Sequence, residues 1–261
     1  ESLPKKRQPK SDFTVSFCSR KSQSDSLKGL ENVGRPSSLS HASLSQLTTS
    51  EAWLPLKLII AEKPSVARDL AQALGIRSQG RVSFRGEDFI ITWAIGHLVT
   101  LAEPHQINPV WQKWRESDLP ILPSTWPLTV LDNTAAQFAE IKSLLHLPEV
   151  TSVIAATDAG REGELIFRYI YEKAESHKPV QRLWLSSLTQ ESIAEAFRNM
   201  KPLSAYDRLA DNARGRSRSD WLVGLNLSRA YSLKNNDRWT VGRVQTPTLA
   251  MVVERTESIL N

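Results

Sequence analysis

From about residue 55 onward, short apolar runs alternate with stretches in which apolar residues recur at helical spacing. Residues 56–61, LKLIIA, form a brief apolar run that ends at a turn signal, so this run predicts a buried strand. Pro64 suits the first turn of a following helix, and Gly75 is placed to end it. The apolar face of this helix is predicted to consist of Val66, Leu70, Ala73 and Leu74.

The same alternation continues along the chain. The further expected elements are a hairpin turning at 85–88 with its second strand at 89–95, a helix at 133–145, strands at 150–156 and 180–185, and helices at 163–174 and after Thr189. The apolar side of the helix at 133–145 should hold Phe138, Ile141 and either Leu144 or Leu145. Strands alternating with helices predict an α/β fold whose mostly parallel sheet is covered on both faces.

The composition changes twice along the chain. Residues 1–54 are rich in Ser, Lys and Arg and poor in large apolar residues, which predicts a disordered extension. Strand signals disappear after Lys201, and residues 208–233 predict a long helix with one basic side, whereas periodicity is weak just before Leu249. We therefore expect an α/β domain at 55–190 and the beginning of an all-α domain at 191–261. Because the chain starts at Glu1 and shows no helix stop near its end, we also expect it to be a fragment.

Overall composition adds modest constraints. The formal charge of +5 is compatible with a polyanionic partner such as DNA, although many basic proteins bind none. A single cysteine, Cys18, forms neither an internal disulfide nor a zinc site, which fits a reducing compartment. No apolar run approaches eighteen residues, so no membrane span is expected.

Acidic residues follow two of the predicted strands. Glu62 comes directly after residues 56–61, and Asp158 comes shortly after residues 150–156, with Glu162 one helical turn further on. Ligands of parallel sheets bind outside the carboxyl ends of the strands. Three carboxylates meeting there would suit Mg²⁺, which prefers oxygen ligands. A single acid would be explained more simply as stabilising a helix N-terminus, but the three together favour a metal site.

Several basic and polar residues are candidates for contacting phosphate. Lys63 and Arg161 lie beside the acids, and His97 ends another strand, although solvated or structural roles explain each of them equally well or better. Arg214 shares a helix face with Arg218, which would be a solvated face or a nucleic-acid contact.

A second group of candidates lies near the C-terminus of the sequence. Arg243, Gln245 and Thr246 offer donors beside a helix start, as a phosphate site or as an ordinary polar loop.

Taken in order, these segments resemble one protein family. EKPSVA, GHL, ATDAGREGELIFRYI, RLWLSSLT, ARGRSRSDWLVGLNLSRAYS and VGRVQTPTL occur as they do in type IA DNA topoisomerases, and the sequence is most similar to bacterial topoisomerase III. The similarity extends from about residue 57 to residue 254. The first motifs alone would indicate only a Toprim module, which primases and some nucleases share, whereas SDWLVGLNLSRAY and VGRVQTPTL are far more specific.

The resemblance implies a Rossmann-like Toprim domain at 55–190, followed by the start of a helical domain that holds single-stranded DNA. It also implies Mg²⁺-dependent, ATP-independent breakage, passage and rejoining of DNA in the cytoplasm of a bacterium, at the nucleoid. By motif, Glu62 matches a general acid and Lys63 a residue that stabilises phosphate charge, while Glu62, Asp158 and Glu162 match metal ligands. His97, Arg161, Arg214, Arg243, Gln245 and Thr246 are the expected DNA contacts.

Two departures from the family pattern change what we expect. Gly160 stands where the acidic motif has its middle aspartate, so Mg²⁺ binding should be weaker or be completed by water, Glu164 or a DNA phosphate. No segment resembles the one that bears the nucleophilic tyrosine of the family, so the chain alone should not cleave DNA. The four tyrosines fall in other motifs or helices: Tyr169, Tyr171, Tyr206 and Tyr231. The alternatives are a non-catalytic DNA-binding remnant and a Toprim nuclease or primase.

Overall fold

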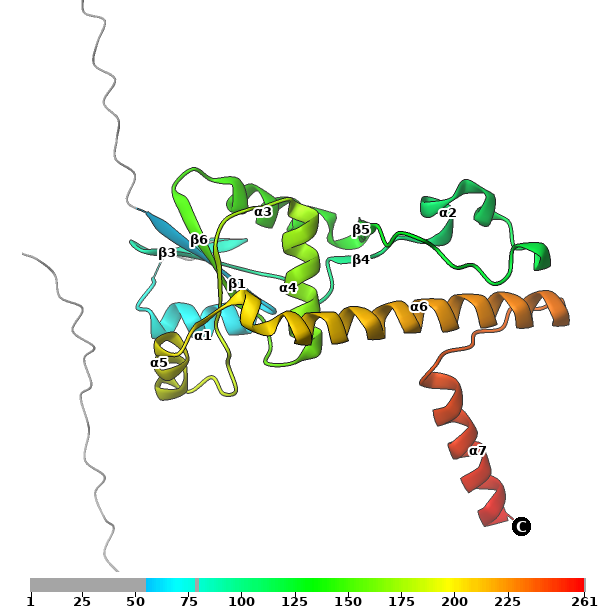
Figure 1. Cartoon of the computed structure of the whole chain (residues 1–261). Helices are drawn as coiled ribbons and strands as arrows, with labels where there is room; N and C mark the ends of the chain where they lie inside the picture. Colours follow the sequence, from blue (N-terminus) through cyan, green and yellow to red (C-terminus); the bar gives the residue numbers. More distant parts are fainter. Residues whose placement is uncertain (1–54, 78–79, 261) are drawn as a thin grey trace, which may run out of the picture. The chain divides into compact units, whose positions relative to one another are not determined.

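A computed structural model describes residues 55–77 and 80–260, and the predicted extension at 1–54 lies outside the described residues. The centre of the fold is a six-stranded sheet with the strand order β2-β3-β1-β6-β7-β8 (Figure 1). The strands are β1 (Leu56–Ala61), β2 (Ser83–Arg85), β3 (Phe89–Trp93), β6 (Val150–Ala156), β7 (Val180–Arg182) and β8 (Lys201–Pro202). The four inner strands are parallel, and the two edge strands are antiparallel to their neighbours. The predicted α/β fold with a mostly parallel sheet is confirmed.

Helices cover both faces of this sheet (Figure 1). One face packs against α1 (Pro64–Ala73) and α5 (Gln190–Arg198), and the other packs against α3 (Ala135–His146) and α4 (Arg161–Ala174). Successive residues of β1 therefore point into two different cores. Ile59 contributes to the first and Leu58 to the second, and both are fully buried. Burial on both faces explains why the inner strands are continuous apolar runs.

Most predicted elements are present, with shifted ends. The hairpin turn at 85–88 is confirmed, and Gly75 has the positive φ of 69° that ends a helix. In α3 it is Leu145 that is fully buried. The strand expected at 89–95 ends at Trp93, and the strand expected at 180–185 ends at Arg182. The fourth helix begins at Arg161, two residues earlier than expected, because the polar first turn has no apolar periodicity.

Short elements escaped the sequence pattern. A second, two-stranded sheet pairs β4 (Val99–Leu101) with β5 (Leu128–Val130). The elements near this sheet are α2 (Pro104–Ile107), η1 (Pro109–Gln112), η2 (Glu116–Asp118) and η3 (Asp132–Thr134). The two residues of β8 lie where strand signals were expected to end. Elements of two to four residues are too short to show a period, which is why these were missed.

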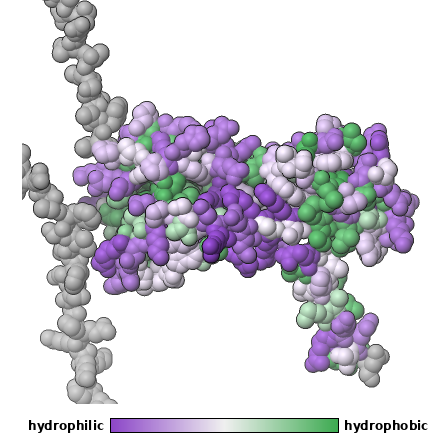
Figure 2. Space-filling model, in the orientation of Figure 1, coloured by the Kyte–Doolittle hydropathy of each residue, from purple (hydrophilic) through white to green (hydrophobic). Residues whose placement is uncertain are grey.

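The C-terminal part is helical. The elements are η4 (Leu203–Tyr206), the 29-residue α6 (Asp207–Asn235) and α7 (Gln245–Leu260). The indole of Trp221 in α6 donates to the carbonyl of Ala102 at 3.1 Å, and Asn226 binds the backbone of Ile121. Figure 2 shows apolar side chains gathered on the visible face over the C-terminal half of α6. None of the helices in the described ranges is long and apolar enough to cross a membrane.

The helix start expected beside Arg243, Gln245 and Thr246 is confirmed. The helix begins at Gln245, four residues before the apolar periodicity begins at Leu249. The hydroxyl of Thr246 accepts a hydrogen bond from the backbone N–H of Gly242 at 3.0 Å, so a polar side chain organises this turn. Such side-chain-to-backbone bonds leave no hydrophobic period, which explains why the periodicity is weak before Leu249 although the helix has already begun.

One glycine fixes how α4 approaches the end of β6. A Cβ added to Gly163 would lie 2.2 Å from the carbonyl oxygen of Asp158 and 2.8 Å from its nitrogen. Both contacts are with backbone atoms, so a side chain cannot relieve them by rotating. The close approach of helix and loop therefore requires glycine at this position.

We predict that Gly163→Ala lowers the free energy of unfolding by about 1–3 kcal/mol, the usual cost of forcing extra volume into a packed site. Gly215→Ala is the matched control, because a Cβ at that helical position meets nothing within 4 Å. This control should raise stability by about 0.5–1 kcal/mol through helix propensity. Urea unfolding followed by circular dichroism measures both, and equal effects of the two changes would contradict the prediction.

Candidate active site at the carboxyl edge of the sheet

The two strands that precede the predicted acids are neighbours. Strand β1 pairs with β6 in parallel, with Ala61 opposite Ala156, so the residues that follow both strands emerge at the same edge. The carboxylate of Glu62 accepts a hydrogen bond from the backbone N–H of Asp158 at 3.0 Å. Glu62 is buried, at 7% exposure. The expected meeting of Glu62 and Asp158 thus has a direct structural basis.

Lys63 lies between these two carboxylates. Its ammonium Nζ is 2.9 Å from Oδ2 of Asp158 and 3.6 Å from Oε1 of Glu62. Asp158, through its hydrogen bond and its charge, raises the pKa of Lys63 above its ordinary value, and Glu62 acts in the same direction. A raised pKa favours the charged form, so the ammonium stays protonated at neutral pH and would lose its proton only above its usual range.

Glu162 does not join that pair in this structure. Its Oε1 is 2.6 Å from Nε2 of His97, so these two predicted site residues contact each other. Both side chains are exposed to solvent. Across residues 55–77 and 80–260, no three His, Cys, Asp or Glu side chains are grouped closely enough to hold a metal ion. The assignment of Glu162 as a metal ligand stays a prediction.

Glu62 and Asp158 nonetheless fit a Mg²⁺ ion. Proteins often hold this ion with one or two carboxylates, and water and phosphate complete its shell. The two acids supply hard oxygen donors at one edge, and an ammonium ion already sits against both of them. The donor chemistry and the attraction for positive charge are therefore those of a cation site.

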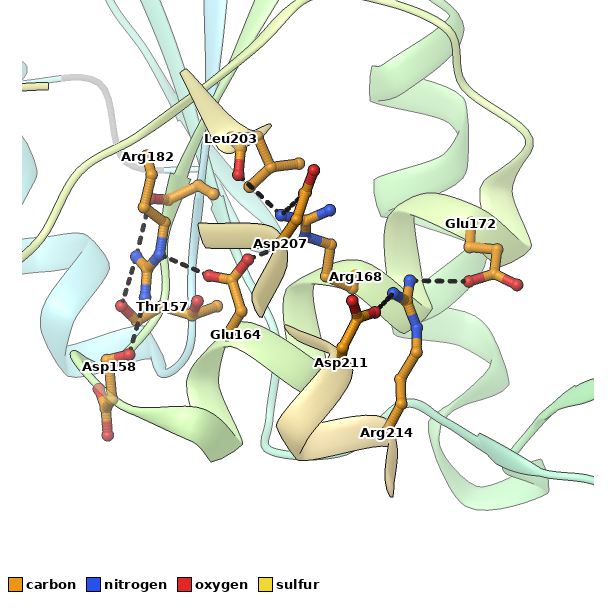
Figure 3. Close-up of polar contacts among 11 residues, drawn as sticks. Thr157, Asp158, Glu164, Arg168, Glu172, Arg182, Leu203, Asp207, Asp211 and Arg214 are labelled. Atoms are coloured by element: carbon orange, nitrogen blue, oxygen red, sulfur yellow. Dashed lines mark hydrogen bonds and ion pairs between the residues drawn. The ribbon is translucent and has the colours of Figure 1, made fainter. Parts of the chain in front are cut away.

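A buried ion pair supports this edge from behind (Figure 3). Arg182 is fully buried, and its Nε donates to Oε2 of the equally buried Glu164 at 3.0 Å. The other guanidinium nitrogens donate to the backbone carbonyls of Ala155, Thr157, Asp158 and Leu183 at 2.8–3.0 Å. Arg182 therefore holds the chain where it leaves β6 and leads to Asp158.

Sequence reasoning missed this role of Arg182. The available signal was a cation inside the apolar strand of RLWLSSLT, because a charge there needs a buried partner. The proposal that Glu164 replaces the missing metal ligand is wrong in this structure. Its Oε1 accepts from Arg168 at 2.8 Å and its Oε2 accepts from Arg182, so both oxygens are engaged away from solvent.

The same cluster reaches the helical part. Arg168 also donates to the carbonyl of Leu203 at 2.7 Å and pairs with Asp207, the first residue of α6 (Figure 3). The predicted DNA contact Arg214 pairs with Glu172 of α4 at 3.4 Å and with Asp211. Arginines of both helices thus connect α4 to α6.

The remaining predicted DNA contacts occupy two places. Arg161 donates to the side chain of Asn212 at 3.3 Å, which puts it between α4 and α6. Arg243 donates to Asp220 at 2.6 Å, and Gln245 and Thr246 begin α7. Arg243, Gln245 and Thr246 are exposed. The structure therefore groups these three at the start of α7, and their contact with DNA stays a prediction.

Comparison with known proteins agrees with this architecture. The sequence pattern of the Toprim domain matches residues 57–188, and that of the DNA topoisomerase family matches residues 204–261. The chain belongs to the type IA DNA topoisomerase family. Relatives of this chain include DNA topoisomerase 3 of Bacillus cereus, which is 48% identical over 204 residues, and that of Bacillus subtilis, which is 46% identical over 202 residues.

These alignments cover 78% and 77% of this chain but 28% of each relative. The chain therefore spans less than a third of the length of these curated relatives. The full-length topoisomerase I of Thermotoga maritima is structurally similar, with a TM-score of 0.54 and 22% identity. That similarity covers 78% of this chain and 31% of the other, and it concerns the fold alone.

The missing middle aspartate of the family has space in this structure. Gly160 has an extended backbone, with φ 172° and ψ 178°, and a Cβ there would meet nothing within 4 Å. We predict that Gly160→Asp tightens Mg²⁺ binding about thirtyfold, the effect of one added unit charge about 4 Å from a divalent ion in a water-like dielectric. Isothermal titration with Mg²⁺ measures this change. Gly160→Asn, which has the same shape without the charge, should leave the affinity unchanged, and an equal gain in both variants would refute the electrostatic explanation.

Proposed function

We propose that this chain supplies the metal-binding and part of the DNA-holding machinery of a type IA topoisomerase. The proposed reaction breaks one DNA strand, passes another strand through the gap and rejoins the break, with Mg²⁺ and without ATP. The observation that supports it best is the cluster of Glu62, Lys63 and Asp158 at the carboxyl edge of two neighbouring parallel strands. Charged groups placed where a phosphodiester reacts are the main requirement for phosphoryl transfer.

Each residue of the cluster has a proposed role. Glu62 is buried at the reacting edge and is oriented by the N–H of Asp158, and we assign to it the role of the general acid that gives a proton to the departing 3′ oxygen. Lys63 has a half-exposed ammonium that is charged at neutral pH, which suits it to stabilise negative charge on the transferring phosphate. When bound at Glu62 and Asp158, with Glu162 as an additional ligand, Mg²⁺ would supply neutralising charge for that phosphate.

The partner in this proposal is DNA, mainly single-stranded. Residues 55–190 would form the Toprim domain, and residues 191–261 would form the beginning of the helical domain that holds the strand. His97 and Arg161 would contact DNA near the acidic edge, and Arg214, Arg243, Gln245 and Thr246 would contact it along the helical part. Since the substrate would be chromosomal DNA, we propose the nucleoid in the bacterial cytoplasm as the place of action.

The nucleophile is proposed to come from outside these 261 residues. Burial raises the pKa values of Tyr169 and Tyr171, which makes both phenols poorer nucleophiles, and Tyr206 is stacked on Trp184. Tyr231 is exposed on α6. In the described part of the chain no hydrogen bond joins any tyrosine to Glu62 or Lys63, and the matched relatives extend far beyond the aligned length.

We predict that the chain alone does not relax negatively supercoiled DNA in the presence of Mg²⁺, because it lacks the tyrosine that attacks the phosphodiester. Adding the corresponding downstream segment of the Bacillus cereus relative should restore relaxation, measured as topoisomers separated on agarose gels. Adding that segment to the Asp158→Asn chain is the matched control and should restore less.

The outcomes separate the alternatives. Relaxation by the chain alone would overturn the proposal that the nucleophile is supplied from outside. Single-stranded DNA binding without any restored relaxation would favour a non-catalytic DNA-binding remnant. A Toprim nuclease or primase is the weaker alternative, because residues 204–261 match the DNA topoisomerase family.

We further predict that Arg243→Ala weakens binding of a single-stranded oligonucleotide and reduces the slope of log affinity against log salt by about 0.7, as expected for one lost phosphate contact. Fluorescence anisotropy at several salt concentrations measures both quantities. The matched control is Arg198→Ala, at the exposed end of α5, which removes the same charge. Equal slopes for the two variants would show that Arg243 makes no specific phosphate contact.

A further inference from the structure

The position of Lys63 has a consequence beyond its proposed role in catalysis. The ammonium touches the two carboxylates that fit a divalent cation, at 2.9 Å and 3.6 Å. An ammonium and a metal ion cannot both occupy the space between these oxygens, because both are cations and would repel each other at that distance. The side chain therefore stands where the metal would bind.

We infer that Lys63 is an internal counter-cation that competes with Mg²⁺ for Glu62 and Asp158 and leaves them when the ion binds. This inference rests on the proposed function, because it concerns the same two carboxylates. One cation replaces another at this edge. As Mg²⁺ binds the two acids, the ammonium of Lys63 is released and becomes available to contact the DNA phosphate.

The local structure allows this exchange without moving the backbone. Lys63 precedes Pro64 at the start of α1 and has an extended backbone, with φ −139° and ψ 153°, so its Cα is held by the helix start. Its side chain is 51% exposed, and its flexible four-carbon stem allows the ammonium to turn toward solvent. Only side-chain torsions need to change.

The charges of the edge determine which cation its two carboxylates favour. Glu162 is engaged with His97, and position 160 is glycine, so the ammonium and the metal contend for two carboxylates. One ammonium neutralises half of their charge, whereas a divalent ion neutralises all of it. A third acid beside these two would favour the divalent ion further, because an added negative charge attracts a divalent ion more strongly than it attracts a monovalent ammonium.

Isothermal titration with Mg²⁺ alone, in the absence of DNA, tests the inference on the full chain. In the parent chain Mg²⁺ must displace the ammonium from the carboxylates, and Lys63→Met removes this cost. The variant should therefore bind Mg²⁺ at least about fivefold more tightly, the factor for the attraction between the ammonium and one carboxylate about 4 Å away in a water-like dielectric. Lys63→Gln should behave in the same way. Lys57→Met is the matched control, because Lys57 is exposed at the opposite end of β1, and its affinity should equal that of the parent chain.

Unchanged or weaker Mg²⁺ binding in both Lys63 variants would overturn the inference, as would an equal gain in Lys57→Met. The Asp158→Asn variant separates this failure from failure of the proposed function. If the parent binds Mg²⁺ and Asp158→Asn does not, the metal site stands even when the exchange fails. If Asp158→Asn leaves the titration unaltered, the metal site and the exchange fail together.

Discussion

The carboxyl edge of the sheet depends on one buried ion pair. Arg182 and Glu164 are both fully buried, and the guanidinium also binds the carbonyls of the residues that end β6 and follow it. A buried charge is costly unless its partner and its remaining hydrogen bonds are all in place. All of them are in place here, so Arg182 fixes the path of the chain from β6 to Asp158. The pairing of Asp158 with Glu62 follows from that path.

Glu164 also connects this edge to the helical part. One carboxylate oxygen binds Arg182 and the other binds Arg168, which reaches Asp207 at the start of α6. The same side chain therefore positions the strand end and the first turn of the helix that is proposed to hold DNA. Two basic partners on one carboxylate also leave it no free oxygen for a metal, which separates its structural role from that of Asp158 although both belong to one short motif.

The features that could be predicted from the sequence are those whose stabilising interactions leave a regular pattern of apolar residues. The buried strands β1 and β6 were found because burial on both faces produces continuous apolar runs. The meeting of Glu62 with Asp158 was expected on the condition that these two strands are neighbours, and the pairing of β1 with β6 meets that condition. The role of Arg182 was not found, because a charge in a strand has no period and its partner is 18 residues away. The contact of His97 with Glu162 joins the loop after β3 to the first turn of α4, and no local sequence pattern encodes the pairing of two such distant residues.

Because position 160 is glycine, the edge lacks a third acid there. This absence alters the charge balance of the edge more than its backbone geometry. Glu62 and Asp158 share the ammonium of Lys63, and Glu162 has His97 as its neighbour, so each acid of the edge has a partner from the same chain. An edge with internal partners is stable without a bound ion, whereas three unpaired carboxylates would repel one another until a cation arrived. Metal binding at such an edge is therefore an exchange of partners. The affinity for Mg²⁺ is set by the difference in free energy between the edge paired with Lys63 and the edge with the ion bound. Substitution of Lys63 therefore changes this affinity as directly as substitution of Glu62 or Asp158.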